Sequence, residues 1–118
     1  MNQPVPKISE SDVERVVRRD YPADVVPTVL ATLAEYGPKA WHNEPTRVRL
    51  AILRMADGNL DELRKALAVA QTDYRDVLAV AEYPQYFRAG NSIDRDEQKR
   101  QAIIQADWQQ YRDWVSRP

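Results

Sequence analysis

The sequence EYGPKAWHNEPTR contains the only histidine of the chain. A neutral imidazole at His42 could act as a general base near pH 7, and the free N–H groups of a helix that begins after Asn43 could hold an anion. Loops placed on rigid helices often carry function. These two residues, the tryptophan before them and two arginines of the following helix form a possible ligand or anion loop of Trp41, His42, Asn43, Arg47 and Arg49.

Catalysis at this loop would require more groups than the sequence supplies. A general base needs an orienting carboxylate and a nucleophile or polarising group, and no spacing in the sequence identifies either one. We therefore predict no catalytic residue, and we interpret His42 as an ordinary loop histidine beside a packing tryptophan. A small enzyme or an anion-binding protein that uses Trp41, His42 and Asn43 is the alternative.

Metal and cofactor sites have little support in the sequence. One histidine and no cysteine leave only carboxylates as further metal ligands. The stretch DRDEQKRQAIIQ begins like a calcium loop, but Lys99 stands where that loop requires glycine and Gln105 stands where it requires a closing acid. The sequence therefore predicts no metal site, and no motif indicates a cofactor.

A second group of chemically active side chains lies in the sequence TDYRDVLAVAEYPQYFR. Asp73 and Asp76 fall in the first turn of an expected helix, where carboxylates stabilise free N–H groups. Pro84 ends that helix, and we expect Tyr86 and Phe87 to fold back onto the bundle. We favour this structural interpretation; the alternative is a binding edge formed by Arg75, Glu82, Tyr83 and Tyr86.

The last helix carries more large side chains than one contact face can bury, namely Ile103, Ile104, Trp108, Tyr111, Trp114 and Val115. Trp108 lies in line with Ile104 and Tyr111, so we expect it to be the inward anchor. Trp114 is offset from that line, and we expect it to be the exposed contact. The pattern predicts that the chain self-associates or binds a protein partner through this helix.

Composition limits the class of protein. The 118 residues have the length of one domain, and we treat 1–118 as a single helical domain with a loose N-terminal segment at 1–8. The net charge is −1, so the chain has no general attraction to nucleic acid. No segment approaches the ~20 apolar residues that cross a bilayer, and the start MNQPVPK has no signal-peptide run. We therefore expect a cytoplasmic location and no membrane partner.

Apolar residues recur at helical spacing, and no segment alternates apolar and polar residues over the length of a strand. The sequence predicts an all-α fold, a compact bundle of five or six helices with a long C-terminal helix. The expected elements are a helix from Ser11 to Tyr21, a second from Asp24 to Tyr36, a central hairpin of helices at 44–57 and 60–71, a fifth helix at 73–82, and a long sixth helix from Ser92 or Asp94.

The helix starts rest on capping patterns. Ser11 with Glu14, Asn59 with Glu62, and Asp73 can each supply a side chain to the free N–H groups of a first turn. The predicted core consists of Val16, Leu30, Leu33, Ile52, Leu63, Leu67, Val77 and Leu78. For function, we expect a non-catalytic protein-interaction module, because no complete catalytic constellation can be assembled from these residues.

Overall fold

The computed structural model describes residues 7–39, 42–89 and 96–118, which form seven helices and no strand. The prediction of an all-α fold with a long C-terminal helix is therefore confirmed, with one short helix more than expected. The helices are α1 (Glu10–Asp20), α2 (Val26–Leu33), α3 (Pro45–Ala56), α4 (Leu60–Thr72), α5 (Tyr74–Glu82), α6 (Pro84–Ala89) and α7 (Glu97–Ser116). None of the described helices has the length and apolar character that crossing a membrane requires.

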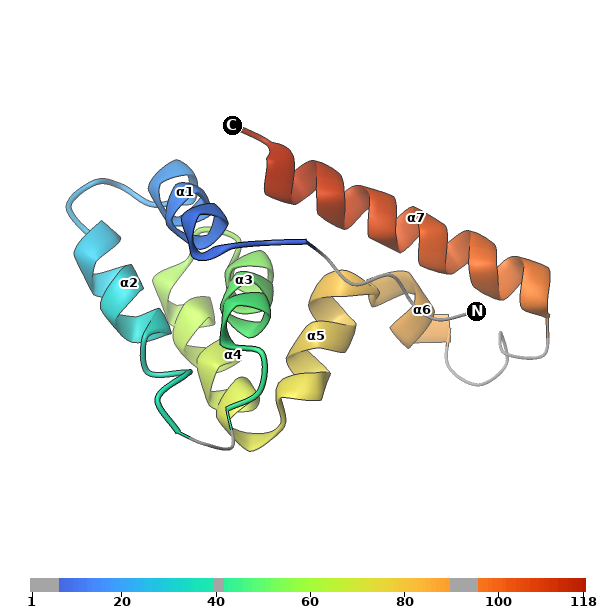
Figure 1. Ribbon diagram of the computed structural model, residues 1–118, viewed down its shortest axis with the longest axis horizontal. Coiled ribbons are helices and arrows are strands. Elements are labelled where there is room, and N and C mark those ends of the chain that lie inside the picture. The colour runs from blue at the N-terminus through green and yellow to red at the C-terminus, as the bar shows by residue number, and fades with distance from the viewer. Residues whose placement is uncertain (1–6, 40–41, 90–95) are drawn as a thin grey trace.

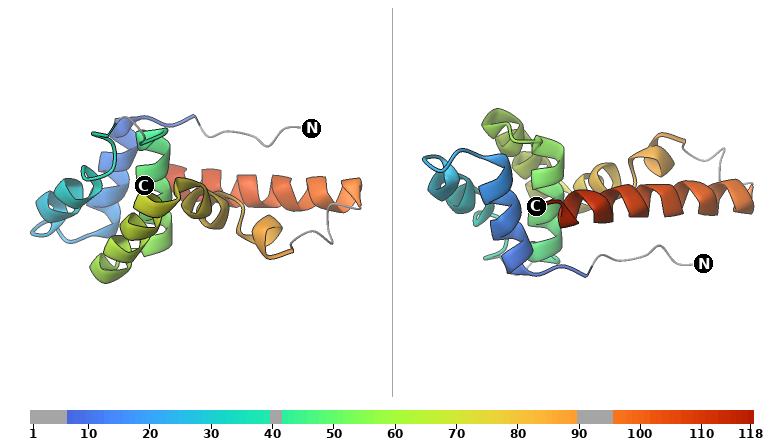
Figure 2. Two further views of the ribbon diagram at one scale, coloured as in Figure 1. Left: turned by 90° about the horizontal axis from the view of Figure 1, so that it is seen from below. Right: turned by 90° about the horizontal axis from the view of Figure 1, so that it is seen from above.

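The first five helices pack together at one end of the molecule, and α6 leads away from them under α7 (Figure 1). The hairpin of α3 and α4 is central, as predicted, because α1 and α5 both pack against α3. Both views in Figure 2 show α7 extending beyond this bundle, with its carboxyl end beside α1 and α3. A helix of 20 residues is about 30 Å long.

Helix α1 begins earlier than predicted, at the first of two overlapping capping patterns. Ser9 is the N-cap, and its backbone N–H donates to the Asp12 carboxylate at 2.9 Å. The expected cap at Ser11 with Glu14 is therefore wrong, because the sequence repeats the same serine and acid spacing two residues earlier. Of the segment expected to be loose, residues 1–6 lie outside the described part, and Ile8 packs against the core.

The second helix is shorter than predicted at both ends. A turn in which the Val25 N–H donates to the Pro22 carbonyl at 3.0 Å precedes it, so Asp24 does not cap it. After Leu33 the chain continues in turns rather than as helix to Tyr36. Arg49 on α3 accounts for this early end, since its Nε donates to the carbonyls of both Leu33 and Tyr36, at 3.2 and 2.8 Å.

Local capping patterns correctly located two other helix starts, those of α4 and α5. Asn59 accepts from the Glu62 N–H at 2.9 Å, and Asp73 accepts from the Arg75 N–H at 3.0 Å. Asp96 caps α7; the predicted start at 92 or 94 lies outside the described residues. The turn between α3 and α4 needs glycine at position 58, because its φ is +79° and a Cβ there would lie 3.0 Å from the Asp20 carbonyl.

A short helix, α6, replaces the predicted aromatic turn after Pro84. Its free N–H groups are capped from another helix, since Gln85 and Tyr86 donate to the Asp107 carboxylate of α7 at 3.3 and 3.0 Å. Phe87 is 53% exposed, so the prediction that it folds back onto the bundle is wrong. Seven of the eight predicted core residues are buried, and Leu30 is partly buried against the same core.

Candidate functional site

His42 is buried in the turn region between α2 and α3, and both ring nitrogens are engaged. Its Nδ1 accepts the backbone N–H groups of Gly37 and Lys39 at 2.8 and 3.1 Å. Because Nδ1 accepts, the ring proton lies on Nε2, which donates to Oε1 of Gln71 at 2.7 Å. Gln71 in turn donates to the Glu35 carbonyl at 3.1 Å. This network fixes the orientation of the imidazole ring.

The geometry of His42 favours the structural interpretation over general-base catalysis. A base must offer its lone pair to a substrate proton, and the lone pair on Nδ1 faces two backbone donors. The ring also lies against Tyr36, with ring centroids 4.4 Å apart, and the Tyr36 hydroxyl donates to the Asn43 carbonyl at 2.9 Å. His42 therefore ties the turn before α3 to α4. Trp41, the other aromatic residue of the predicted loop, lies outside the described residues.

The two arginines assigned to the anion loop are occupied within the fold. Arg47 makes two parallel bonds to the buried Glu82 carboxylate, Nε to Oε2 at 2.8 Å and Nη2 to Oε1 at 2.7 Å. This bond to Glu82 is the largest cause that raises the pKa of the Arg47 guanidinium. Arg49 holds the end of α2 and lies 3.3 Å from Glu10. Both guanidiniums already have carbonyl or carboxylate partners within the fold, so anion binding at the turn that carries His42 stays a prediction without their support.

The binding edge predicted around α5 is not assembled. Glu82 is 1% exposed, and Tyr83 is also buried, so the alternative interpretation, in which both lie on a binding edge, is wrong. Glu82 is buried because it pairs with Arg47, which places the end of α5 in the core. Burial also raises the pKa of Tyr83 to about 12. Arg75 is exposed and pairs with Asp73 at 3.0 Å, and Tyr86 is half-buried on α6.

The roles of the two tryptophans of α7 are the reverse of the prediction. Trp114 is 3% exposed, with the Arg19 and Arg54 guanidinium carbons 5.2 and 5.3 Å from its ring centroid. The prediction that Trp114 is an exposed contact is therefore wrong, and Trp108 is the partly exposed residue. Asp107 is the physical reason, because its buried carboxylate caps α6 and rotates the inward stripe of α7 toward Trp114.

Two arginines of α1 hold the carboxyl end of α7, where helix carbonyls have no partner within the helix. Arg15 donates to the carbonyls of Val115 and Arg117 at 2.6 and 2.9 Å. Arg19 donates to the carbonyls of Trp114 and Arg117 at 2.7 and 2.8 Å. We call this contact the arginine clamp, and it fixes the end of α7 against α1.

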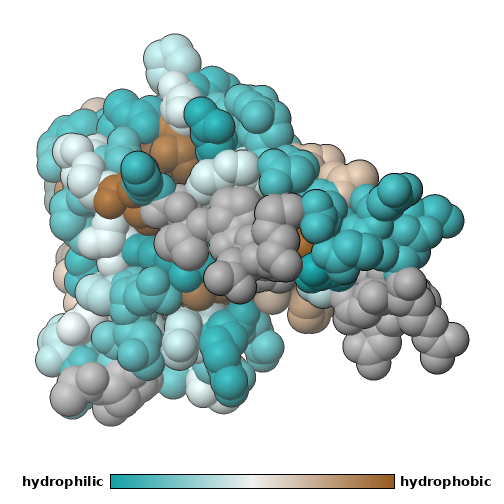
Figure 3. All heavy atoms as spheres, turned by 45° about the vertical axis from the view of Figure 1, so that its right-hand side comes forward, coloured by the Kyte–Doolittle hydropathy of each residue, from teal (hydrophilic) through white to brown (hydrophobic). Residues whose placement is uncertain are grey.

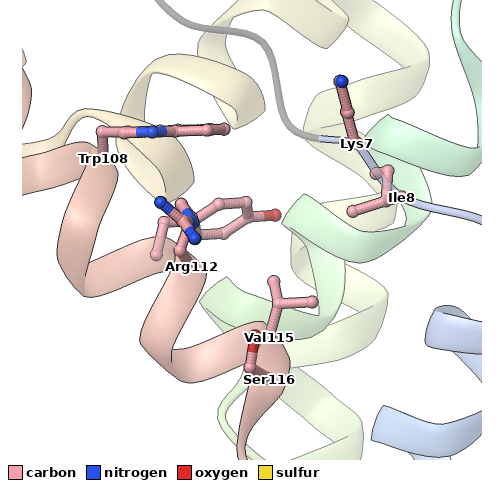
Figure 4. Close-up of a pocket in the computed structure, with 7 residues that line it drawn as sticks. Lys7, Ile8, Trp108, Arg112, Val115 and Ser116 are labelled. Carbon is pink, nitrogen blue, oxygen red and sulfur yellow. The ribbon is translucent and has the colours of Figure 1, made fainter.

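A groove lies between the clamped half of α7 and the residues that precede α1. Its volume is about 380 Å³, and Figure 4 shows side chains from both segments facing its space. The face of the molecule in Figure 3 is mostly hydrophilic, with hydrophobic residues visible only in small separate areas. The groove is lined by Lys7, Ile8, Trp108, Tyr111, Arg112, Val115 and Ser116.

Sequence reasoning missed most of this groove. Trp108 and Arg112 stand four residues apart on a helix, which places both side chains on one face. Their place on a common surface could therefore have been predicted from the sequence. Lys7 and Ile8 come from the other end of the chain, and no local pattern brings them to α7. Among the described residues, no cluster of three histidine or acidic side chains could hold a metal ion.

Comparison with known proteins assigns no relationship, since no family model, no curated protein and no solved structure matches this chain.

Proposed function

We propose that this protein is a non-catalytic protein-interaction module that binds its partner in the groove beside Trp108. The observation that supports the proposal is a partly exposed tryptophan that lines an open groove. Tryptophan is enriched at the centres of protein interfaces, where it supplies a large contact area with few rotatable bonds. The proposal keeps the C-terminal helix as the binding element and assigns the contact to Trp108 in place of Trp114.

The rigidity of α7 further supports this function. The arginine clamp holds the carboxyl end of α7, and Trp114 in the same turn packs against Arg19. Asp107 joins the middle of α7 to α6. A surface held in this way loses little conformational entropy when a partner binds. The groove is therefore suited to act as a preformed site.

The alternative, a small enzyme or ligand-binding protein, has one observation in its favour. A second hollow of about 380 Å³ lies beside the His42 network, where Asn43, Gln71 and Arg75 are among the lining residues. The guanidinium that lines this hollow is that of Arg75, which is exposed and pairs with Asp73, also a lining residue. The two proposals differ in the residue on which activity depends, His42 or Trp108.

Affinity capture from the cells that make the protein tests the proposal, with tagged wild type, Trp108→Ala and Phe87→Ala compared by mass spectrometry. Phe87 is a matched control, because it is an exposed aromatic residue outside the groove. We expect proteins that wild type and Phe87→Ala retain equally and that Trp108→Ala loses. Equal retention by all three would remove the groove as the site, and the absence of any retained protein would contradict the interaction module itself.

A loss confined to His42→Gln would favour the alternative. Thermal unfolding of each variant has to accompany the capture, because His42 also joins the turn before α3 to α4. A small molecule that co-purifies with wild type and Trp108→Ala, but not with His42→Gln, would be the direct sign of a ligand site in the second hollow.

A further inference from the structure

The partner that fits this groove carries acidic groups around an apolar anchor. We propose that the groove binds a peptide segment in which one large apolar or aromatic side chain is flanked by carboxylates on both sides. This inference rests on the proposed function and adds the chemistry of the partner. It follows from the charges at the rim of the groove and from the side chains that form its interior.

The rim of the groove is positive. Lys7 and Arg112 are both exposed, and neither forms an ion pair with another described residue. They approach the space from opposite sides, Lys7 from the chain before α1 and Arg112 from α7 (Figure 4). No acidic residue is among the lining side chains. Complementary charge at both sides is what orients a partner and selects it against neutral ones.

The acidic residues of the neighbouring elements do not pair with this rim, because each described carboxylate of α1 and α7 is directed at another group. Asp12 on α1 accepts from the Ser9 N–H and pairs with Arg15 at 3.3 Å. Asp113 on α7 accepts from Gln109 at 2.9 Å, and Asp107 is buried as the cap of α6. The charges of Lys7 and Arg112 therefore face solvent across the groove.

The interior of the groove is apolar. Ile8 and Val115 contribute aliphatic surface, and Trp108 and Tyr111 contribute aromatic rings. A volume of about 380 Å³ lies at the low end of protein ligand pockets, which suits one anchoring side chain rather than a broad apolar face. Carboxylates on both sides of that anchor would then reach Lys7 and Arg112.

Selection of random twelve-residue peptides displayed on phage tests this chemistry on the full-length protein. We expect the peptides retained by wild type to share an aromatic residue or leucine with aspartate or glutamate on both sides, and we expect Trp108→Ala to retain none of them. Peptides that depend on Trp108 without acidic enrichment would overturn this inference and leave the proposed function standing. Peptides indifferent to Trp108, or no enriched peptide, would overturn both.

A synthetic peptide, one phenylalanine between two runs of four glutamates with an attached fluorophore, provides the quantitative probe. Fluorescence anisotropy should show Arg112→Glu and Lys7→Glu each weakening binding about tenfold or more, with a smaller loss at high salt. Arg88→Glu is the matched control, an equal change of charge at an exposed residue of α6 outside the groove, and it should change binding less than about twofold. An equal effect of all three variants would show attraction by net charge alone and overturn the site.

Two further measurements distinguish an acidic peptide from two other possible occupants of the groove, a neutral peptide and a second copy of the chain. A matching peptide with glutamines in place of the glutamates should bind at least about tenfold more weakly; equal binding would contradict the role of the rim. Sedimentation of wild type and Trp108→Ala at high micromolar concentration should give monomers for both. A wild-type dimer that Trp108→Ala abolishes would mean that a second copy of the chain fills the groove, against the proposal.

Discussion

The buried ion pair of Arg47 and Glu82 provides a sharp test of how this fold is held together. Arg47 bonds both oxygens of Glu82, and the Glu82 side chain is 1% exposed. Removing one member of a buried pair costs ~3–5 kcal/mol, because the other charge is left without its partner away from water. Replacing both members with apolar residues of similar size removes that penalty and is often close to neutral.

The two single substitutions should differ in cost. Arg47→Met leaves the Glu82 carboxylate buried and alone, so we expect a loss near the upper end, ~5 kcal/mol of unfolding free energy. Glu82→Leu leaves Arg47, which is 18% exposed and lies 3.2 Å from Glu44, so we expect a loss near the lower end, ~3 kcal/mol. The double variant should lie within about 1 kcal/mol of wild type.

Urea unfolding followed by far-ultraviolet circular dichroism measures all four chains, with linear extrapolation of the free energy. Arg75→Met is the control, since Arg75 is the exposed member of an ion pair with Asp73, and its unfolding midpoint should stay at the wild-type value. A double variant that loses the sum of the single costs would refute the reasoning, because the two residues would then act independently. Single losses below about 1 kcal/mol would refute it as well.

Four other predictions follow from single contacts. Trp114→Ala should lower the free energy of unfolding by ~3–5 kcal/mol, measured in urea, and a loss below about 1 kcal/mol would contradict its role as the anchor of α7. Gly37→Ala should cost ~1–3 kcal/mol in thermal unfolding, because Gly37 has a φ of +141° and a Cβ would collide with the Arg49 guanidinium; an unchanged melting temperature would contradict that conformation. Asp107→Ala should cost about 1–2 kcal/mol and should increase hydrogen exchange at the first N–H groups of α6, whereas unchanged exchange there would show that α6 does not need this cap. Burial, followed by the nearby acids, raises the pKa of Tyr21 from 10.0 to about 12, so the contribution of the neutral phenol to stability is complete below pH 10 and is lost as the pH rises through 12. Tyr21→Phe should therefore reduce the fall of the urea midpoint between pH 10 and 12. A fall identical to that of wild type would contradict the raised pKa of Tyr21.

The elements that local chemistry determines could be predicted from the sequence. The capping residues Asn59 and Asp73 lie within three residues of the N–H groups they accept from, so pattern and structure agree. The same locality explains the error at Ser11. Two equivalent capping patterns overlap there, and the choice of Ser9 depends on the packing of the whole first helix, which a spacing rule does not contain.

The parts that could not be predicted depend on contacts between distant segments. In the sequence, Asp107 is a polar residue near several apolar ones. Its burial is explained only by the position of α6, whose N–H groups it accepts from. His42 meets Gln71 from α4, 29 positions along the chain, and Arg47 meets Glu82 at a separation of 35. The burial of Trp114 could not be predicted for the same reason, since the two arginines that lie over its ring come from α1 and α3.

The arginine clamp has a consequence for the order in which the chain folds during synthesis. Arg15 and Arg19 belong to the first helix, yet the carbonyls they bond are about a hundred residues later, at the end of α7. During synthesis Arg15 and Arg19 leave the ribosome before the residues whose carbonyls they bond, so this contact forms only after Trp114 and Val115 have emerged, while the helices between them can already pack. A chain shortened before Trp114 would therefore leave Arg15 and Arg19 without the carbonyls that join α1 to α7.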